Sequence, residues 1–352
     1  MKRYRIEIFA RSDLSFITFA ECEEPDINID FLVSAQSKTT APGQITASVG
    51  DFAQIRIDGR VYYQGIINDL SFDGSKTEIT LLQLRELLNT EQFADVNLLK
   101  EQTIETWFSA ILTDTFNGSD PSQNLPGFVV RSQSATNGTH AETNNGSYNL
   151  YDLAVSFFKV YGVVIDISFD VNLKRVLFVF RSVSSDVLKI DLTVSDVIEY
   201  EIQPSLSSDS PNKMTIREQE NPENVLVYYW HPTEFSGTID TDPSYNRVVP
   251  VINKCEVVNP DDEETFSDAA YSKAEETLYS TRYDDLISVT IRADSNLVND
   301  WQIGQLYTLY ADGRKYNTLL TGIHTASMAS IELTFGYIRK RLTQILKMRK
   351  GN

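Results

Sequence analysis

Alternating apolar and polar residues predict β-strands in two segments that lie far apart in the chain, residues 49–62 and residues 303–316. Such alternation places the apolar side chains on one face of a strand, as expected when that face is buried. An Asp-Gly pair lies in each segment, Asp58-Gly59 in the first and Asp312-Gly313 in the second. Gly takes positive φ without strain and Asp tolerates it, so this pair is typical of a two-residue hairpin loop. Each segment therefore predicts a β-hairpin.

The two segments resemble each other over more than the turn. Aligned without a gap, both begin with an apolar residue followed by Gly, and both carry Asp-Gly-Arg and then Tyr. A Gly-Ile pair and an alternating run (78–81 and 331–334) follow each of them. A Gly inside a strand marks a bulge or a close approach of another backbone. We interpret eight residues as structural turn positions of a repeat: Gly50, Asp58, Gly59, Gly65, Gly304, Asp312, Gly313 and Gly322.

The repeat predicts the fold class: α+β, mainly β, with two tandem small β-barrels or sandwiches and α/β insertions, in a four-domain plan. Common ancestry of the two modules is our interpretation, and chance similarity of two hairpins is the alternative. We expect a first module over 1–95, completed by about 170–202, with an inserted α/β domain at 96–169. The second module is expected at 203–231 and 283–338, with a smaller one-helix insertion at 232–282 and a basic helix or tail at 339–352.

Three amphipathic helices are predicted between the strands. The first covers Ile104–Phe116 with Thr103 as its cap, and the second covers Tyr148–Tyr161, capped by Ser147 and ended by Gly162. The third begins at Ser267 or Asp268 and runs through Tyr279. Strands are expected at 163–169 and 175–181, and the polar stretch 117–146 reads as a long loop.

Composition narrows the function. The chain has 352 residues, and its net charge of −18 argues against a surface built to grip nucleic acid, although an acidic wall suits a conduit through which DNA passes unbound. No apolar run reaches the length of a spanning helix, so we expect no stable membrane insertion. The first residues lack the apolar core of a signal peptide, which predicts synthesis in a cytoplasm without general export. Cys22 and Cys255 lie far apart, and we expect both to be reduced.

The sequence holds no convincing catalytic or metal-binding pattern. Its three histidines, His140, His231 and His324, have no zinc-ligand spacing, and neither a Gly-x-Ser-x-Gly elbow nor a Gly-rich phosphate loop is present. The acidic run 261–264 reads as a charge cluster before the third helix rather than a calcium site. We therefore predict no enzyme, no catalytic residue, no metal and no cofactor.

The duplicated module, its α/β insertions and the segment 331–342 resemble the baseplate hub or tail-associated proteins of phages, prophages and phage-tail-like bacteriocins of Gram-positive bacteria. The resemblance implies a structural virion protein at the tail tip or baseplate, assembled in the cytoplasm of the bacterial host. It implies a homotrimeric hub that adapts a six-fold tail tube to a three-fold tip and closes the DNA conduit. The implied partners are the distal tail protein ring, the tape measure protein and a tail fibre, spike or receptor-binding protein. Longer relatives carry an endopeptidase or fibre region after this point, and because the sequence ends at Asn352 we expect no enzymatic domain here.

Two alternatives stay open at this point. The first is a receptor- or carbohydrate-binding tail-tip protein, with Tyr228 and Trp230 as sugar platforms. The second is a peptidoglycan-degrading tail enzyme that acts through paired acids.

Overall fold

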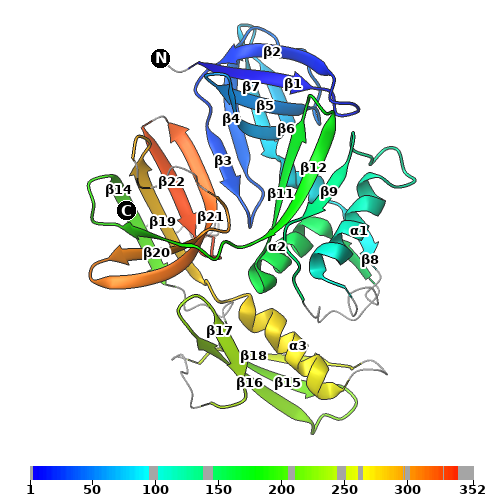
Figure 1. The fold of residues 1–352 in the computed structure, drawn as a ribbon, viewed down its shortest axis with the longest axis vertical. Coiled ribbons are helices and arrows are strands. Elements are labelled where there is room, and N and C mark those ends of the chain that lie inside the picture. The colour runs from blue at the N-terminus through cyan, green and yellow to red at the C-terminus, as the bar shows by residue number, and fades with distance from the viewer. Residues whose placement is uncertain are drawn as a thin grey trace.

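The chain folds into two curled β-sheets, an α/β unit and a small sheet covered by one helix (Figure 1). The computed structural model describes residues 3–94, 102–137, 146–204, 211–243, 251–260, 265–295, 297, 302–327 and 329–339. In these ranges β-strands outnumber helices, so the fold is α+β and mainly β. No helix of the described residues is long and apolar enough to cross a membrane.

The first sheet is made of six strands from the N-terminal part of the chain, at the top of Figure 1. In spatial order they are β2 (Phe16–Cys22), β1 (Tyr4–Phe9), β5 (Phe52–Ile57), β6 (Arg60–Phe72), β7 (Lys76–Gln83) and β4 (Gln36–Pro42). The sheet curls, so its edges meet: the Glu23 backbone N–H, just after β2, donates to Thr40 O in β4 at 2.7 Å. Buried aliphatic side chains such as Ile6, Ile55 and Leu81 fill the interior.

The second sheet combines strands from both ends of the chain. Its order is β13 (Val187–Asp191), β20 (Leu306–Ala311), β21 (Arg314–Ser327), β22 (Ser330–Phe335), β19 (Asp285–Arg292) and β14 (Val197–Pro204). A seventh strand, β3 (Ile27–Asp30), comes from the N-terminal region and pairs with β21. Because β3 lies between β2 and β4 in the chain, this strand links the first sheet to the second.

Four strands of each sheet have the same arrangement. In the first sheet β5, β6, β7 and β4 lie side by side, and in the second β20, β21, β22 and β19 do. In both sets the strand that comes first along the chain pairs antiparallel with the one that comes last. The register also shifts at corresponding places, between Ile67 and Asp69 in the first set and between Leu320 and Gly322 in the second. The similarity read from the hairpins thus extends over four strands.

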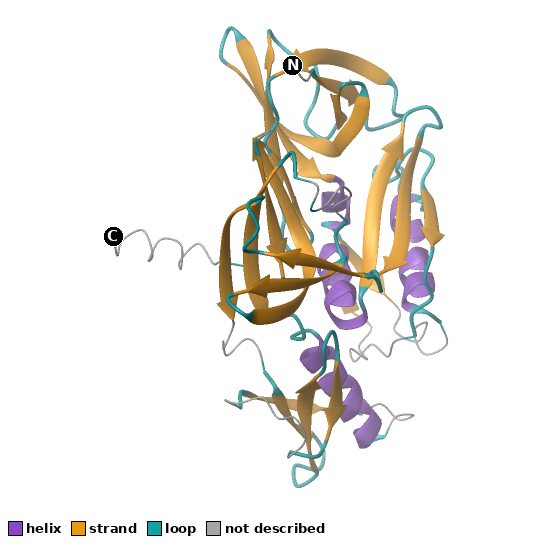
Figure 2. Cartoon of the chain, turned by 60° about the vertical axis from the view of Figure 1, so that its left-hand side comes forward, coloured by secondary structure: helices purple, strands orange, loops and turns teal. Residues whose placement is uncertain are grey.

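The α/β unit lies between the two sheets in the chain. Its strands are β9 (Val129–Ser132), β11 (Val163–Asp170) and β12 (Arg175–Ser182), with the short pair β8 (Glu91–Ala94) and β10 (Gly146–Asn149) alongside. The helices α1 (Ile104–Phe116) and α2 (Leu150–Tyr161) pack on the three-stranded sheet (Figure 2). Their shared core holds Trp107, Phe108, Phe157 and Phe178. The 3-10 helix η1 (Leu84–Leu88) links this core to the first sheet.

The fourth part, which we call the small module, lies at the end of the molecule opposite the first sheet (Figures 1 and 2). Its strands are β17 (Gly237–Asp240), β16 (Val225–Pro232), β15 (Lys213–Glu218) and β18 (Asn253–Val258), in that spatial order. The helix α3 (Phe266–Tyr279) covers one face of this sheet.

Strand partners correct the expected domain bounds in two places. The sequence predicts that residues of about 170–202 complete the first module, but β12 belongs to the α/β unit, and β13 and β14 pair with β20 and β19 in the second sheet. The sequence predicts that residues 203–231 begin the second module, but β15 and β16 belong to the small module, which therefore starts earlier than residue 232. Alternation reveals which face of a strand is buried and does not reveal its partner, so both errors have the same cause.

The predicted helix bounds agree more closely with the structure. The α1 prediction is confirmed, with the Thr103 side chain accepting from Thr106 N at 3.3 Å. The second helix ends as predicted at Gly162 (φ 68°), but it begins at Leu150 and Asn149, not Ser147, caps it. Ser147 lies in β10, where backbone pairing with β8 competes with the helix. The third helix is capped by Thr265, just before the expected start. The stretch 117–146 is not all loop, because it contains β9. Three predicted features lie outside the described residues: His140, the acidic run 261–264, and the basic tail that follows Arg339.

Candidate functional site: the polar junction between the two sheets

A polar junction forms where β3, which lies between β2 and β4 in the chain, pairs with β21 of the second sheet. Asp30, the last residue of β3, is the pairing partner of Gly322 in β21, and the Phe31 backbone N–H donates to Thr321 O at 2.9 Å. The next residues, Leu32 and Val33, turn so that their backbone N–H groups donate to Asp30 Oδ1 at 2.7 Å and 3.2 Å. The Asp30 carboxylate is thereby held in a fixed place between the sheets.

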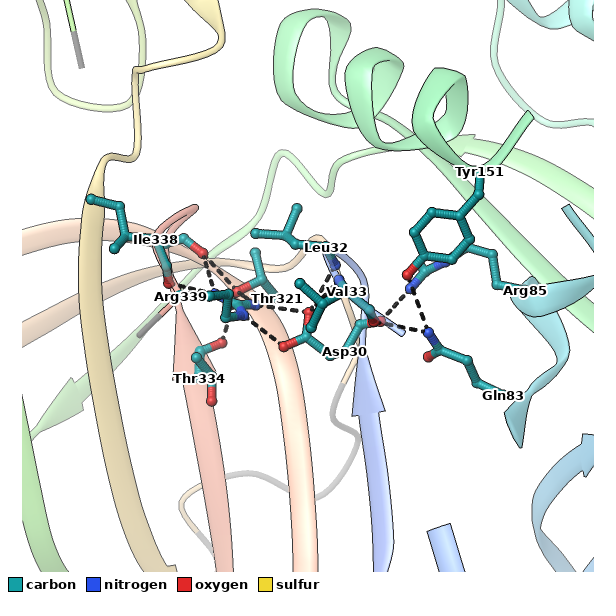
Figure 3. A network of polar contacts seen from close by, with 11 residues as sticks. Asp30, Leu32, Val33, Gln83, Arg85, Tyr151, Thr321, Thr334, Ile338 and Arg339 are labelled. Carbon is teal, nitrogen blue, oxygen red and sulfur yellow. Dashed lines mark hydrogen bonds and ion pairs between the residues drawn. The ribbon is translucent and has the colours of Figure 1, made fainter. Parts of the chain in front are cut away.

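Arg339 reaches this carboxylate from the opposite end of the chain (Figure 3). Its Nε donates to Asp30 Oδ2 at 2.6 Å and one terminal nitrogen donates to Oδ1 at 3.1 Å, which is the two-point geometry that suits a guanidinium. Both side chains are largely buried, so water screens the pair weakly. The same guanidinium donates to the backbone carbonyls of Gly336 (3.1 Å) and Ile338 (2.9 Å). The two contacts with Asp30 tie β3 to the segment after β22, and the two carbonyls hold the guanidinium in place.

Thr321 completes that side of the junction. Its hydroxyl is fully buried and accepts a hydrogen bond from Arg339 at 2.8 Å. The single hydroxyl hydrogen is shared between Gly336 O at 2.8 Å and Thr334 O at 3.1 Å. Gly336 has a φ of 78°, and a Cβ there would lie 1.8 Å from the carbonyl oxygen of Asp285. Only glycine fits this backbone, so the polar cluster depends on a position that accepts no side chain.

A second arginine holds the opposite side of the same segment. Arg85, in η1, is only 8% exposed and donates to the Asp30 backbone carbonyl. Its guanidinium carbon lies 3.8 Å from the centre of the Phe31 ring and 5.2 Å from that of Tyr151 in α2. Burial lowers the pKa of Arg85, and the two aromatic rings offset part of the cost of burying its charge. The junction thus joins β3, the first sheet and the α/β unit.

Polar side chains at its edge extend the junction. Gln83, at the end of β7, donates to Val33 O at 3.1 Å and to the Tyr151 hydroxyl at 3.4 Å. Near the far end of β21, His324 Nε2 lies 2.7 Å from Asp26 Oδ1, and its Nδ1 lies 3.5 Å from Glu332 Oε2. The hydrogen bonds with Glu332 and then Asp26 raise the pKa of His324, although burial opposes the shift.

Four of the predicted turn residues form two equivalent loops. Asp58 and Gly59 have φ of 49° and 83°, and Asp312 and Gly313 have φ of 51° and 72°. Ile57 pairs with Arg60, and Ala311 pairs with Arg314, so each loop has two residues with positive φ. These loops connect β5 to β6 and β20 to β21, and a Cβ on either glycine would meet no atom within 4 Å.

Gly50 and Gly304 also occupy equivalent positions. The Gly50 N–H donates to Ile67 O, and the Gly304 N–H donates to Leu320 O, each at 2.8 Å. Both residues have positive φ, 94° and 82°.

Gly65 and Gly322 lie inside strands rather than turns, and they are not equivalent. Gly65 opposes Ala53, whereas the strand position that corresponds to Gly322 is Asp69, because Asp69 and Gly322 both follow the register shift. Each has its own close contact: a Cβ on Gly65 would lie 2.6 Å from Leu82 O, and one on Gly322 would lie 3.2 Å from Thr334 Cβ and 3.4 Å from Asp30 Oδ2. Of the predicted glycines, Gly322 is therefore the one that borders the junction.

The two aromatic residues that the carbohydrate-binding alternative requires at the surface are buried. Trp230 and Tyr228 are 5% and 6% exposed and form part of the core of the small module, together with Met214 and Leu278. His231 is also buried. Within the described ranges no group of three His, Cys, Asp or Glu side chains has the arrangement of a metal site.

The junction itself escaped sequence reasoning. Arg339 stands at the start of the basic segment 339–352, which reads as a solvated tail, and Asp30 lies in an ordinary alternating strand. The sequence shows only that both residues adjoin apolar ones. That pattern is common on protein surfaces and does not indicate a buried ion pair.

Comparison with solved structures places this fold among phage tail proteins. The chain is similar to a tail protein from Neisseria meningitidis MC58 (TM-score 0.55, 14% identity, 95% of this chain and 96% of that one). It is equally similar to the 43 kDa tail protein of prophage MuSo2 from Shewanella oneidensis (0.55, 14%, 96% and 98%). A prophage tail protein, gp18, from Listeria monocytogenes EGD-e also matches (0.53, 10%, 99% and 98%). No protein-family model and no curated protein matches the sequence. The chain thus has the fold of phage tail proteins over nearly its whole length.

Proposed function

We propose that the chain is a structural virion protein, the hub of a tail tip or baseplate in a phage or phage-tail-like particle. Three copies surround the tail axis. The observation that carries this proposal is the four-strand arrangement that occurs twice in one chain, in β4–β7 and in β19–β22. Three copies supply six similar sheets, which is the number needed to face a six-fold tail tube. The far side of the ring keeps three-fold symmetry and receives a fibre, a spike or a receptor-binding protein.

The polar junction supports this role. A ring of six similar sheets requires the same spacing and angle between the two sheets of every chain. The bidentate contact between Arg339 and Asp30, with Arg85 on the other side of β3, holds these two sheets by directional bonds. The arrangement is suited to hold position, and we propose a role without catalysis.

The partners in this proposal are the distal tail protein ring, the tape measure protein and the fibre or spike. DNA passes through the channel without specific binding, since a chain with a net charge of −18 repels phosphate. Before infection the hub closes this conduit. The protein assembles in the cytoplasm of the host bacterium and resides at the tail tip or baseplate of the particle.

The decisive test is the assembly state. Light scattering over a wide concentration range is expected to give a mass three times the 39.8 kDa of one chain. Particle images are expected to show six similar densities around a channel on one face and three on the other. A chain that stays monomeric at high concentration, or a ring without the six-fold pattern, would overturn the hub.

A further inference from the structure

The small module carries an open pocket that lies apart from the polar junction. It is about 700 Å³ in volume and lies between the first half of α3 and the end of β17. The module lies at the end of the molecule away from the first sheet (Figure 1). The hub role does not require this pocket.

An exposed aromatic ring forms one side of the pocket. Tyr271, in α3, is 42% exposed, and its ring centre lies 5.9 Å from that of Tyr228 at an interplanar angle of 75°. Tyr228 belongs to the buried core of the module, so this edge-to-face contact supports Tyr271 from below. The exposed aromatic surface of this module is thus provided by Tyr271 and not by Tyr228. A fixed ring at the side of a pocket is a ready apolar platform for a ligand.

The other lining groups accept or exchange hydrogen bonds. Asp240 at the end of β17 and Asp268 in the first turn of α3 supply carboxylates, while Thr241 and Ser267 supply hydroxyls. One oxygen of each carboxylate is used locally: Asp240 Oδ1 accepts from Asp242 N at 3.0 Å, and Asp268 Oδ2 accepts from Thr265 Oγ1 at 2.7 Å. Among the described residues, no donor is paired with the second oxygen of either carboxylate.

The charge of the lining selects the ligand class. The lining residues that the structure describes include no Lys or Arg, and the whole chain is strongly acidic, so a phosphate or carboxylate ligand would be repelled. An aromatic platform beside carboxylate and hydroxyl acceptors suits a ligand that has an apolar C–H face and several hydroxyl donors. We propose that this pocket binds a neutral saccharide, with a sugar ring on Tyr271 and its hydroxyls donating to Asp240 and Asp268.

Saturation-transfer NMR tests the proposal with the full chain and four separate probes: an N-acetylglucosamine oligomer, a maltose oligomer, glycerol phosphate and choline. We expect transfer to at least one neutral oligomer and none to glycerol phosphate. Tyr271→Ala should weaken that binding about tenfold, because it removes the ring on which the sugar packs. Tyr310→Ala is the matched control, since Tyr310 is 39% exposed but lies on β20 in the second sheet.

Two further variants keep the test sharp if Tyr271→Ala disturbs folding. Tyr271→Phe preserves the platform and should retain binding, whereas Asp240→Asn should weaken it without removing any apolar contact. No binding of either neutral oligomer, binding that Tyr271→Ala and Asp240→Asn leave unchanged, or a response to choline alone would overturn the proposal. The mass of the assembly, measured on the same samples, separates this outcome from a failure of the hub proposal.

Discussion

Replacing Arg339 by alanine tests whether the polar junction holds the two sheets together. The change removes both contacts to the Asp30 carboxylate and those to Thr321, Gly336 O and Ile338 O. Breaking a buried ion pair by removing one partner costs about 3–5 kcal/mol, because the other charge stays buried alone. Here Asp30 keeps its backbone donors at Leu32 and Val33, which favours the lower end. We therefore expect a loss of about 3 kcal/mol at the junction.

Hydrogen exchange is the appropriate assay, because a chain with several folded parts does not unfold in a single step and local opening reports local stability. The amide to follow is that of Phe31, which donates to Thr321 O across the junction. A loss of about 3 kcal/mol corresponds to roughly 100-fold faster exchange, as long as exchange proceeds through opening of the junction. Amides of the small module should keep their rates.

Arg292→Ala is the matched control. Arg292 also contacts a carboxylate through two nitrogens, with its Nη2 2.8 Å from Asp294 Oδ2, but both side chains are mostly exposed. Exposed pairs contribute little to stability, so this variant should leave the Phe31 amide unchanged. The reasoning is refuted if Arg339→Ala accelerates exchange at Phe31 no more than Arg292→Ala does.

Three further changes have expected outcomes. Gly59→Val and Gly313→Val should each destabilise their own sheet by about 1–2 kcal/mol, because the loops require positive φ. Thermal unfolding measures this loss, and Asn at the same positions should cause a smaller one. Unfolding of both Val variants at the wild-type temperature would contradict the turn assignment. Gly237→Ala should destabilise the small module by about 1–3 kcal/mol in urea unfolding, since its Cβ would lie 2.3 Å from the Trp230 ring; Trp230→Phe in the same chain should restore part of the loss, and an unchanged midpoint would count against this contact. The raised pKa of His324 means that its stabilising effect is complete below about pH 6.5, the unfolded value, and is lost as the pH rises through the folded pKa. His324→Gln should therefore destabilise the protein more at about pH 5.5 than at about pH 9. An equal effect at both pH values would exclude the proposed bridge to Asp26 and Glu332.

The sequence is most informative where structure depends on neighbours in the chain. The α1 helix begins at the residue after Thr103 because the cap and the apolar spacing are both local signals. The Asp-Gly loops follow in the same way from the φ preferences of two residues. The second helix was misjudged by two residues because Ser147 and Asn149 are both good caps, and the choice between them depends on the pairing of β10 with β8.

Strand partners were out of reach for a physical reason. β3 pairs with β21 although nearly the whole chain separates them, and its alternating pattern would suit either sheet equally well. The lack of equivalence between Gly65 and Gly322 has another origin, because Gly65 follows Gly59 by six residues whereas Gly322 follows Gly313 by nine. The register shift of β6 against β5 between Ile55 and Arg56 accounts for only one further residue, so Asp69 corresponds to Gly322. Asp30 and Arg339 could not be paired from sequence, since their contact depends on the completed second sheet.

The chemistry of the junction explains why it suits a protein that works by position. An apolar contact between the two sheets would be favourable over a range of relative positions, since the hydrophobic effect has no direction. The bidentate bonds between Arg339 and Asp30 are favourable in one relative position of the two sheets only. The Thr321 hydroxyl and the Gly336 carbonyl in turn hold the guanidinium in place. Burying Arg85 and this ion pair costs desolvation that aliphatic side chains would avoid. That cost is understandable if the angle between the sheets is what the protein must preserve. In the proposed ring an error in this angle would be repeated in each chain and would prevent closure, so a polar junction is better suited to the task than a more stable but less directional apolar one.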